Sequence, residues 1–136
     1  MRHLSILLLL GCSACGISQS APQSAPQAAS GTLGQIHALI GAAPCTGSAQ
    51  CATLALGAKS CGGPEFYLAW STANTTAPKL AALAARFQGL RQAEDAASGA
   101  MSDCRMVSDP GAVCQKPTGA DAGKCVLRAP EGGRAD

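Results

Sequence analysis

The sequence CATLALGAKSCGGPEFYLAW, residues 51–70, holds two short apolar runs on either side of a segment rich in glycine and proline. The first run ends at Gly57 and is short and apolar, which predicts a strand. Two glycines and Pro64 predict a tight turn directly after Cys61. The second run, Phe66 to Trp70, holds all but one of the aromatic residues. It fits either a strand or a helical turn in the centre of the domain.

Two helices are predicted on either side of this stretch. The first covers residues 32–43 and ends before Pro44, because apolar residues recur there at helical spacing. The second covers residues 78–97, with a hydroxyl and a proline near its start and a glycine near its end. Both helices carry one apolar stripe, formed by Leu33, Ile36, Leu39 and Ile40 in the first and by Leu80, Leu83, Phe87 and Leu90 in the second.

A small hairpin is predicted near the carboxyl terminus. Residues 112–116 and 124–128 read as its two strands, separated by a turn-rich segment. In this register Cys114 faces Cys125. The predicted fold class is therefore α+β: a small disulfide-rich domain with two helices, short strands and a C-terminal hairpin.

The composition indicates one domain with a thin core. The chain has 136 residues, a formal net charge of only +2, and few charged (13%) or aromatic (3%) residues. Such a weak net charge is not typical of proteins that bind nucleic acid. Domains that bury few large side chains often depend on covalent cross-links.

An even set of six cysteines is spread over the predicted domain, and in an exported protein it predicts three disulfides. We expect no metal, cofactor or redox catalysis, because the set has neither the close pairs of a zinc site nor a C-x-x-C pair at the start of a helix. Six cysteines allow 15 connectivities. The pairing that we predict is Cys45–Cys51, Cys61–Cys104 and Cys114–Cys125.

The amino terminus has the pattern of an export signal, because Arg2 and His3 precede an apolar run that is too short to span a membrane. The sequence Leu-Leu-Gly-Cys that ends at Cys12 resembles the lipobox of bacterial lipoproteins. This resemblance implies that residues 1–11 are cleaved off and that Cys12 carries acyl chains such as palmitate, which anchor the protein in the outer membrane. Cys15 is the alternative site, and it leaves no odd cysteine. Ordinary secretion without a lipid is a further alternative.

The segment behind the lipid anchor is of low complexity. Residues 12–31 contain two copies of Ser-Ala-Pro-Gln and no large apolar residue after Ile17, which predicts a disordered tether. The six-cysteine domain is then expected over residues 32–128. A flexible tail is expected over residues 129–136.

The spacing of the cysteines resembles that of a group of small bacterial envelope lipoproteins of unassigned function. The shared features are Cys-x5-Cys, a Cys-Gly-Gly-Pro segment before an aromatic cluster, a long helix, and Asp-Pro ahead of Cys114, over residues 45–125. The resemblance implies a disulfide framework and no particular activity.

The predicted function is that of a non-catalytic binding or structural module on the periplasmic side of the envelope. Its partners would be the membrane, through the lipid, and an envelope protein or a cell-wall component, with Tyr67 and Trp70 as contact residues. The alternative is an inhibitor of a hydrolase that uses the loop of residues 58–65. An enzyme is not expected, because His37 is the single histidine after the signal segment. No two of the available carboxylates have a reason to converge: Glu65, Glu94, Asp95, Asp103 and Asp109.

Overall fold

The structure is a computed structural model that describes residues 24–99 and 101–129. Cys12, Cys15, the predicted signal segment and residues 130–136 of the predicted tail lie outside the described residues. The elements, in chain order, are α1 (Ala25–Ile40), β1 (Pro44–Cys45), the 3-10 turn η1 (Ser48–Gln50), β2 (Cys51–Leu56), β3 (Phe66–Ser71), α2 (Ala77–Ser98), β4 (Ala112–Gln115) and β5 (Gly123–Leu127). Together with three disulfides, they confirm the predicted class, a small disulfide-rich α+β domain.

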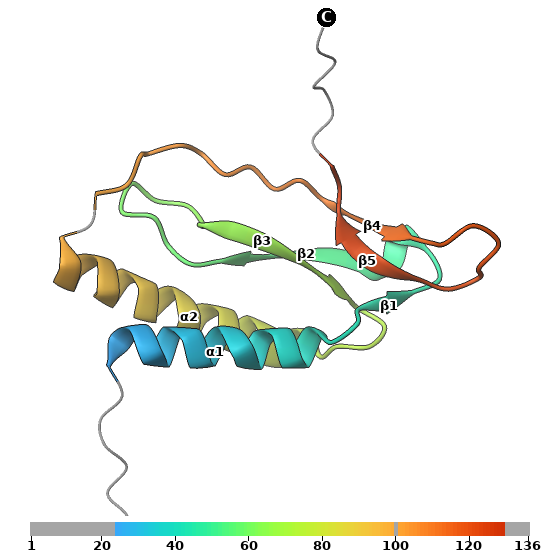
Figure 1. The fold of residues 1–136 in the computed structure, drawn as a ribbon, viewed down its shortest axis with the longest axis horizontal. Coiled ribbons are helices and arrows are strands. Elements are labelled where there is room, and N and C mark those ends of the chain that lie inside the picture. The colour runs from blue at the N-terminus through green and yellow to red at the C-terminus, as the bar shows by residue number, and fades with distance from the viewer. Residues whose placement is uncertain (1–23, 100, 130–136) are drawn as a thin grey trace, which may run out of the picture.

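The helices and the strands form separate layers. Helices α1 and α2 lie side by side, and the antiparallel hairpin of β2 and β3 covers them (Figure 1). A second antiparallel sheet has the strand order β1-β5-β4. Residues 101–111, which we call the strap, have no regular secondary structure and run along the hairpin on the side away from the helices (Figure 1).

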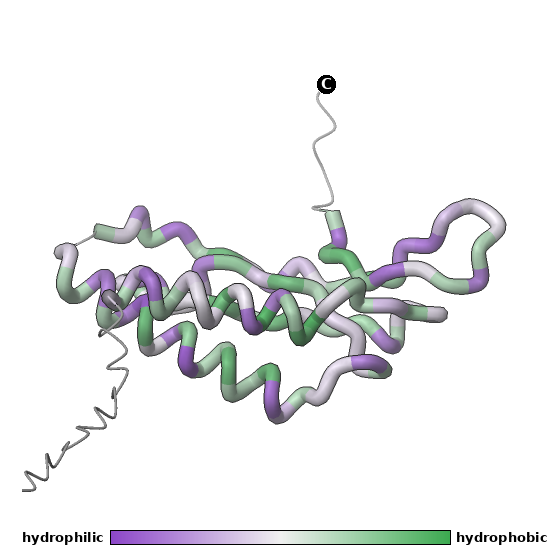
Figure 2. Tube along the Cα trace, turned by 60° about the horizontal axis from the view of Figure 1, so that its bottom comes forward, coloured by the Kyte–Doolittle hydropathy of each residue, from purple (hydrophilic) through white to green (hydrophobic). Residues whose placement is uncertain are grey.

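The core lies between the two helices and the hairpin. Leu56 from β2 and Leu80 from α2 are each 1% exposed. Phe66 of β3 meets Phe87 of α2 edge-on, with ring centroids 6.2 Å apart. Figure 2 shows hydrophobic and hydrophilic residues alternating along both helices, so each helix turns one face inward. The aromatic run is therefore a strand that supplies the core, which decides between the two interpretations left open by the sequence.

The longer predicted helix is confirmed as α2, one residue longer at each end than predicted. Gly99 ends it in the left-handed conformation (φ 65°), and its N–H donates to the Asp95 carbonyl at 3.0 Å. The Thr75 hydroxyl donates to the Leu39 carbonyl at 3.3 Å, which joins the start of α2 to the end of α1. Of the described helices, neither has the length and apolar character needed to cross a membrane.

The first helix begins earlier than predicted, and the prediction that residues 25–31 belong to a disordered tether is wrong. The Ser24 N–H donates to the Gln27 side chain at 3.2 Å, and Pro26 lies in the first turn, an arrangement that starts helices. The helix also ends earlier, at Ile40 instead of residue 43. The chain turns there because the Ala43 carbonyl accepts from the Cys125 N–H at 2.8 Å, which brings the next residues beside β5.

The predicted C-terminal hairpin is confirmed by β4 and β5, and Cys114 lies opposite Cys125 as expected. Two of the three predicted disulfides are nevertheless wrong, namely Cys45–Cys51 and Cys114–Cys125. The physical reason is the tertiary packing of the chain. β1 pairs with β5 and η1 lies against β4, so Cys45 and Cys51 lie next to the β4–β5 hairpin and each bonds to a cysteine of that hairpin. The disulfides are Cys45–Cys114, Cys51–Cys125 and the correctly predicted Cys61–Cys104.

Candidate functional site

The two predicted contact residues have different environments. Trp70 belongs to the core, with 9% of its surface exposed, and its indole N–H donates to the Thr53 carbonyl at 3.3 Å. Burial therefore leaves little of the Trp70 surface accessible to a partner. Tyr67 is half-buried on β3. The aromatic run mainly stabilises the fold, so a binding surface has to be sought elsewhere.

The loop of residues 57–65, between β2 and β3, has an ordered backbone and an exposed end. Residues 60–63 are exposed. The Lys59 N–H donates to the Gly63 carbonyl at 3.0 Å, and the Gly62 N–H donates back to the Lys59 carbonyl at 2.8 Å. Positive φ angles at both glycines, 92° at Gly62 and 81° at Gly63, explain why glycine occupies these positions. The exposed end is thus held in a defined turn.

The strap is fastened to this loop by one disulfide and one lysine. Cys61 of the loop is bonded to Cys104 of the strap. The Lys59 ammonium lies 2.9 Å from the Asp103 carboxylate and donates to the Arg105 carbonyl at 2.8 Å. The hydrogen bond from Lys59, followed by that from the Arg105 N–H, lowers the pKa of Asp103. Loop and strap are therefore ordered as one unit.

A second acidic group fastens the other end of the strap. The Thr53 hydroxyl donates to the Asp109 carboxylate at 2.7 Å, and the Gly111 N–H donates to the same side chain at 2.8 Å. These two hydrogen bonds, the one from Thr53 foremost, lower the pKa of Asp109. The strap is thus attached to β2 as well as to the loop.

Arg91 of α2 connects the loop to the helix layer. Its guanidinium lies 2.9 Å from the Glu65 carboxylate and also binds Glu94. The hydrogen bond with Glu65 is the main cause of the raised pKa of Arg91, although burial acts in the opposite direction. Glu65 also accepts from the Ala58 N–H at 3.2 Å. The expectation that no two carboxylates converge is therefore wrong for Glu65 and Glu94, but a guanidinium lies between them and makes them an ion-pair cluster.

Two methionines of the strap extend into solvent next to the loop. Met101 is 95% exposed and Met106 is 89% exposed, and they are the exposed large hydrophobic residues of the described part of the chain. We call the surface made by loop residues 60–63 and strap residues 101–106 the tip surface. It lies at the same end of the molecule as the start of α1 (Figure 1).

Two of the hollows among the described residues lie beside the tip surface and between the helices. One of about 240 Å³ lies between the loop, the strap and α2, and its lining includes the ion-paired Lys59, Glu65 and Arg91. A hollow of about 560 Å³ between α1 and α2 is lined mainly by apolar residues, together with Gln35 and the cations Lys79 and Arg86.

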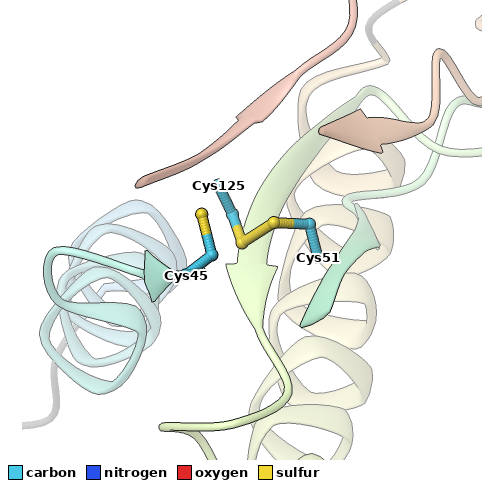
Figure 3. Close-up of side chains that lie close together, drawn as sticks. All are labelled: Cys45, Cys51 and Cys125. Atoms are coloured by element: carbon cyan, nitrogen blue, oxygen red, sulfur yellow. A yellow bond between two sulfur atoms is a disulfide. The ribbon is translucent and has the colours of Figure 1, made fainter. Parts of the chain in front are cut away.

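A second chemically distinctive site lies where β1, β2, β4 and β5 meet. We call the disulfides Cys45–Cys114 and Cys51–Cys125 together the sulfur cluster. Three of its sulfur atoms, those of Cys45, Cys51 and Cys125, lie within 4.8 Å of one another (Figure 3). Each of them is bonded in a disulfide, so this structure offers no thiolate to a metal ion at that place.

Sequence reasoning predicted that all four cysteines of the sulfur cluster form disulfides, but it mostly did not single out the residues that build and fasten the tip surface. Lys59 was included only as one member of the loop 58–65, and Arg91, Met101 and Met106 were not considered. The strap shows no periodicity that would indicate which side chains face solvent. Comparisons of the chain with family models, curated proteins and solved structures found no match.

Proposed function

We propose that the protein is a lipid-anchored module of the bacterial cell envelope that binds a partner without catalysing a reaction. The observation that carries this proposal is the tip surface, where two almost fully exposed methionines lie on a strap that is fastened by a disulfide and by Lys59. A surface ordered before binding loses little conformational entropy when the partner arrives. Methionine side chains adapt well to an apolar partner surface.

The position of the tip surface agrees with attachment to a membrane through the amino terminus. The lipobox-like sequence supports acylation of Cys12, with Cys15 as the alternative, and Ser13 supports the outer membrane. Cys12 and Ser24 are 12 positions apart, so the chain between them spans at most about 40 Å when fully extended. Because α1 starts at the same end as the tip surface, an envelope protein or a cell-wall component near that membrane lies within reach (Figure 1).

The arrangement of ionisable groups supports a non-catalytic role. His37 is exposed on α1. The two converging carboxylates, Glu65 and Glu94, are both bound to Arg91, which fastens the loop to α2. These contacts give both carboxylates a structural partner and hold the tip surface in place.

Photo-crosslinking in intact cells tests the proposal. A photoreactive amino acid at position 106 is expected to give a discrete crosslinked product, which Met101→Asp weakens. The matched control places the same group at Asp121, an exposed residue in the β4–β5 turn at the other end of the molecule (Figure 1). Equal products at the two positions, or none at position 106, contradict the proposal.

The lipid anchor is tested separately by intact mass spectrometry of the membrane fraction, before and after reduction. We expect a mass that corresponds to cleavage before Cys12, added acyl chains and three disulfides. A soluble protein that starts at another residue and carries no acyl chain excludes the anchor, and the tip surface then belongs to a secreted protein.

Inhibition of a hydrolase is a second candidate function. It is favoured by the ordered loop 58–65, because an inhibitor gains affinity from a loop that is already fixed in its bound shape. Assays against a panel of peptidases and lysozymes test it. Inhibition that is lost when Ser60 is replaced by Arg supports this function, and inactivity against the whole panel excludes it for those enzymes.

A further inference from the structure

The sulfur cluster brings two disulfides into one small volume. The sulfur of Cys45 is bonded to Cys114, yet it lies within 4.8 Å of both sulfurs of the Cys51–Cys125 disulfide. Figure 3 shows the Cys45 side chain beside that bond. A thiolate formed at Cys45 would therefore need only a small side-chain movement to reach a second disulfide.

Burial divides the four cysteines into an inner and an outer pair. Cys45 is 3% exposed and Cys125 is 6% exposed, whereas Cys51 and Cys114 are half-buried. Each disulfide joins one inner cysteine to one outer cysteine. A thiol that enters from solvent meets an outer sulfur first and expels the inner partner as a thiolate.

We propose that the sulfur cluster is a reactive site for small thiols, such as cysteine or a glutathione-like peptide, at which attack on an outer cysteine leads to an inner Cys45–Cys125 disulfide. The two residues lie on adjacent strands, where Cys45 is opposite Gly123 and therefore diagonal to Cys125, with both side chains on the same face of the sheet. β1 pairs with β5, and the Ala43 carbonyl accepts from the Cys125 N–H at 2.8 Å. The new bond therefore joins two strands that are neighbours in the existing sheet.

The chemical steps are two successive exchanges. A small thiolate attacks the Cys114 sulfur, a mixed disulfide forms there, the Cys45–Cys114 bond breaks, and Cys45 leaves with the electron pair. The Cys45 thiolate then attacks the Cys125 sulfur, the Cys45–Cys125 bond forms, and Cys51 leaves as a thiolate. Cys51 takes up the proton that the small thiol had released. Attack at Cys51 leads to the same inner disulfide. The mixed disulfide then forms on Cys51, Cys125 leaves as the thiolate that attacks Cys45, and Cys114 becomes the free thiol.

An unpartnered hydroxyl lies next to one of the two leaving groups. Ser71 pairs directly with Cys51 across β2 and β3, so the two side chains share one face of the hairpin. The Ser71 side chain is fully buried, and its hydroxyl has no hydrogen-bond partner among the described residues. A Cys51 thiolate would give this hydroxyl an acceptor, and the hydrogen bond would stabilise the charge on the leaving sulfur.

Mapping the products of a limited reaction tests the proposal. The oxidised full chain is incubated with reduced glutathione, quenched with acid, alkylated, and digested at low pH for mass spectrometry. The expected product has a Cys45–Cys125 bond, glutathione on one outer cysteine and the alkyl group on the other. Ser71→Ala is expected to reduce severalfold the share of molecules alkylated at Cys51 relative to those alkylated at Cys114.

The Cys61–Cys104 disulfide serves as the internal control, because both of its cysteines are exposed and it lies outside the sulfur cluster. It is expected to yield one mixed disulfide and one thiol within the same pair. The proposal is overturned if the alkyl group is found on Cys45 or Cys125 while the original partner carries glutathione. It is also overturned if the sulfur cluster stays intact after Cys61–Cys104 has reacted.

Discussion

The ammonium group of Lys59 lies 2.9 Å from the carboxylate of Asp103, although 44 residues separate the two in the sequence. The side chain of Lys59 is 18% exposed and that of Asp103 is 57% exposed, so water screens the pair and its own contribution to stability is small. The ion pair matters more for the position of the strap than for stability, because it orients the strap next to the Cys61–Cys104 disulfide.

The first prediction concerns the pH dependence of this contact. Because the pKa of Asp103 is lowered in the folded protein, its stabilising contribution is present above the unfolded pKa of the carboxyl group and is lost as the pH falls through the folded pKa. We expect the strap to loosen from the loop as the pH falls through the lowered pKa of Asp103. Lys59→Met should return the pKa of Asp103 toward its ordinary value.

Carbon-13 NMR titration of the carboxyl groups measures this shift. Asp109 is the matched control, since its pKa is lowered by Thr53 and Gly111 and not by Lys59. An Asp103 titration curve that is the same with and without Lys59, or equal shifts of both carboxyl groups, would show that the lysine is not the cause.

The second prediction concerns the disulfide of the tip surface. Replacing both Cys61 and Cys104 by alanine removes a cross-link between residues 43 positions apart, and the free energy of unfolding should fall by about 3 kcal/mol. Hydrogen exchange of the strap should accelerate, because the covalent attachment to the loop is lost. Denaturant unfolding and hydrogen-exchange mass spectrometry measure the two effects. Unchanged protection of the strap would indicate that Lys59 and Asp109 suffice to hold it.

The third prediction uses two glycines with opposite environments. Gly89 is exposed within α2, and a Cβ atom there meets no atom within 4 Å, so Gly89→Ala should raise the free energy of unfolding by about 0.5 to 1 kcal/mol. Gly57→Ala is the contrasting variant. Its φ is 75°, and its Cβ would lie 2.6 Å from the Glu65 side chain, so we expect a loss of stability. Chemical denaturation should give opposite signs, and the same sign for both would refute the explanation.

The fourth prediction concerns the connection between the loop and α2. Arg91→Met leaves the half-buried Glu65 carboxylate without its cation and should lower the free energy of unfolding by about 1 to 3 kcal/mol. Arg86→Met on the same helix is the control. Arg86 is exposed and has no ion pair within the described residues, so its replacement should change stability by less than about 0.5 kcal/mol. Similar losses for both variants would mean that any arginine of α2 has this effect.

The regular elements were largely predictable, because periodic apolar residues mark them along the chain. Helix α2 has such a stripe together with a proline at its start and a glycine at its end. The start of α1 differs from the prediction because Ser24 to Gln27 is also one copy of the Ser-Ala-Pro-Gln repeat, and such a low-complexity repeat predicts disorder. The same four residues have the spacing of a capping box, and this signal was present in the sequence.

Local geometry did not predict the disulfide pairing, and the one predicted bond that is confirmed, Cys61–Cys104, joins residues 43 positions apart. Cys114 and Cys125 are opposite each other in the hairpin, as the turn between them indicates, but their bonding partners come from β1 and β2. The position of β1 beside β5 is a tertiary contact that leaves no periodic signal. The tip surface could not be predicted either, because the exposure of Met101 and Met106 depends on the path of an irregular segment.

All three disulfides join a cysteine that precedes α2 to one that follows it. During synthesis, Cys45, Cys51 and Cys61 therefore emerge from the ribosome before any of their native partners has been translated. Oxidation of the nascent chain at that stage can only produce bonds that must later be undone. The covalent framework can be completed only when oxidation acts on a chain that extends through residue 125.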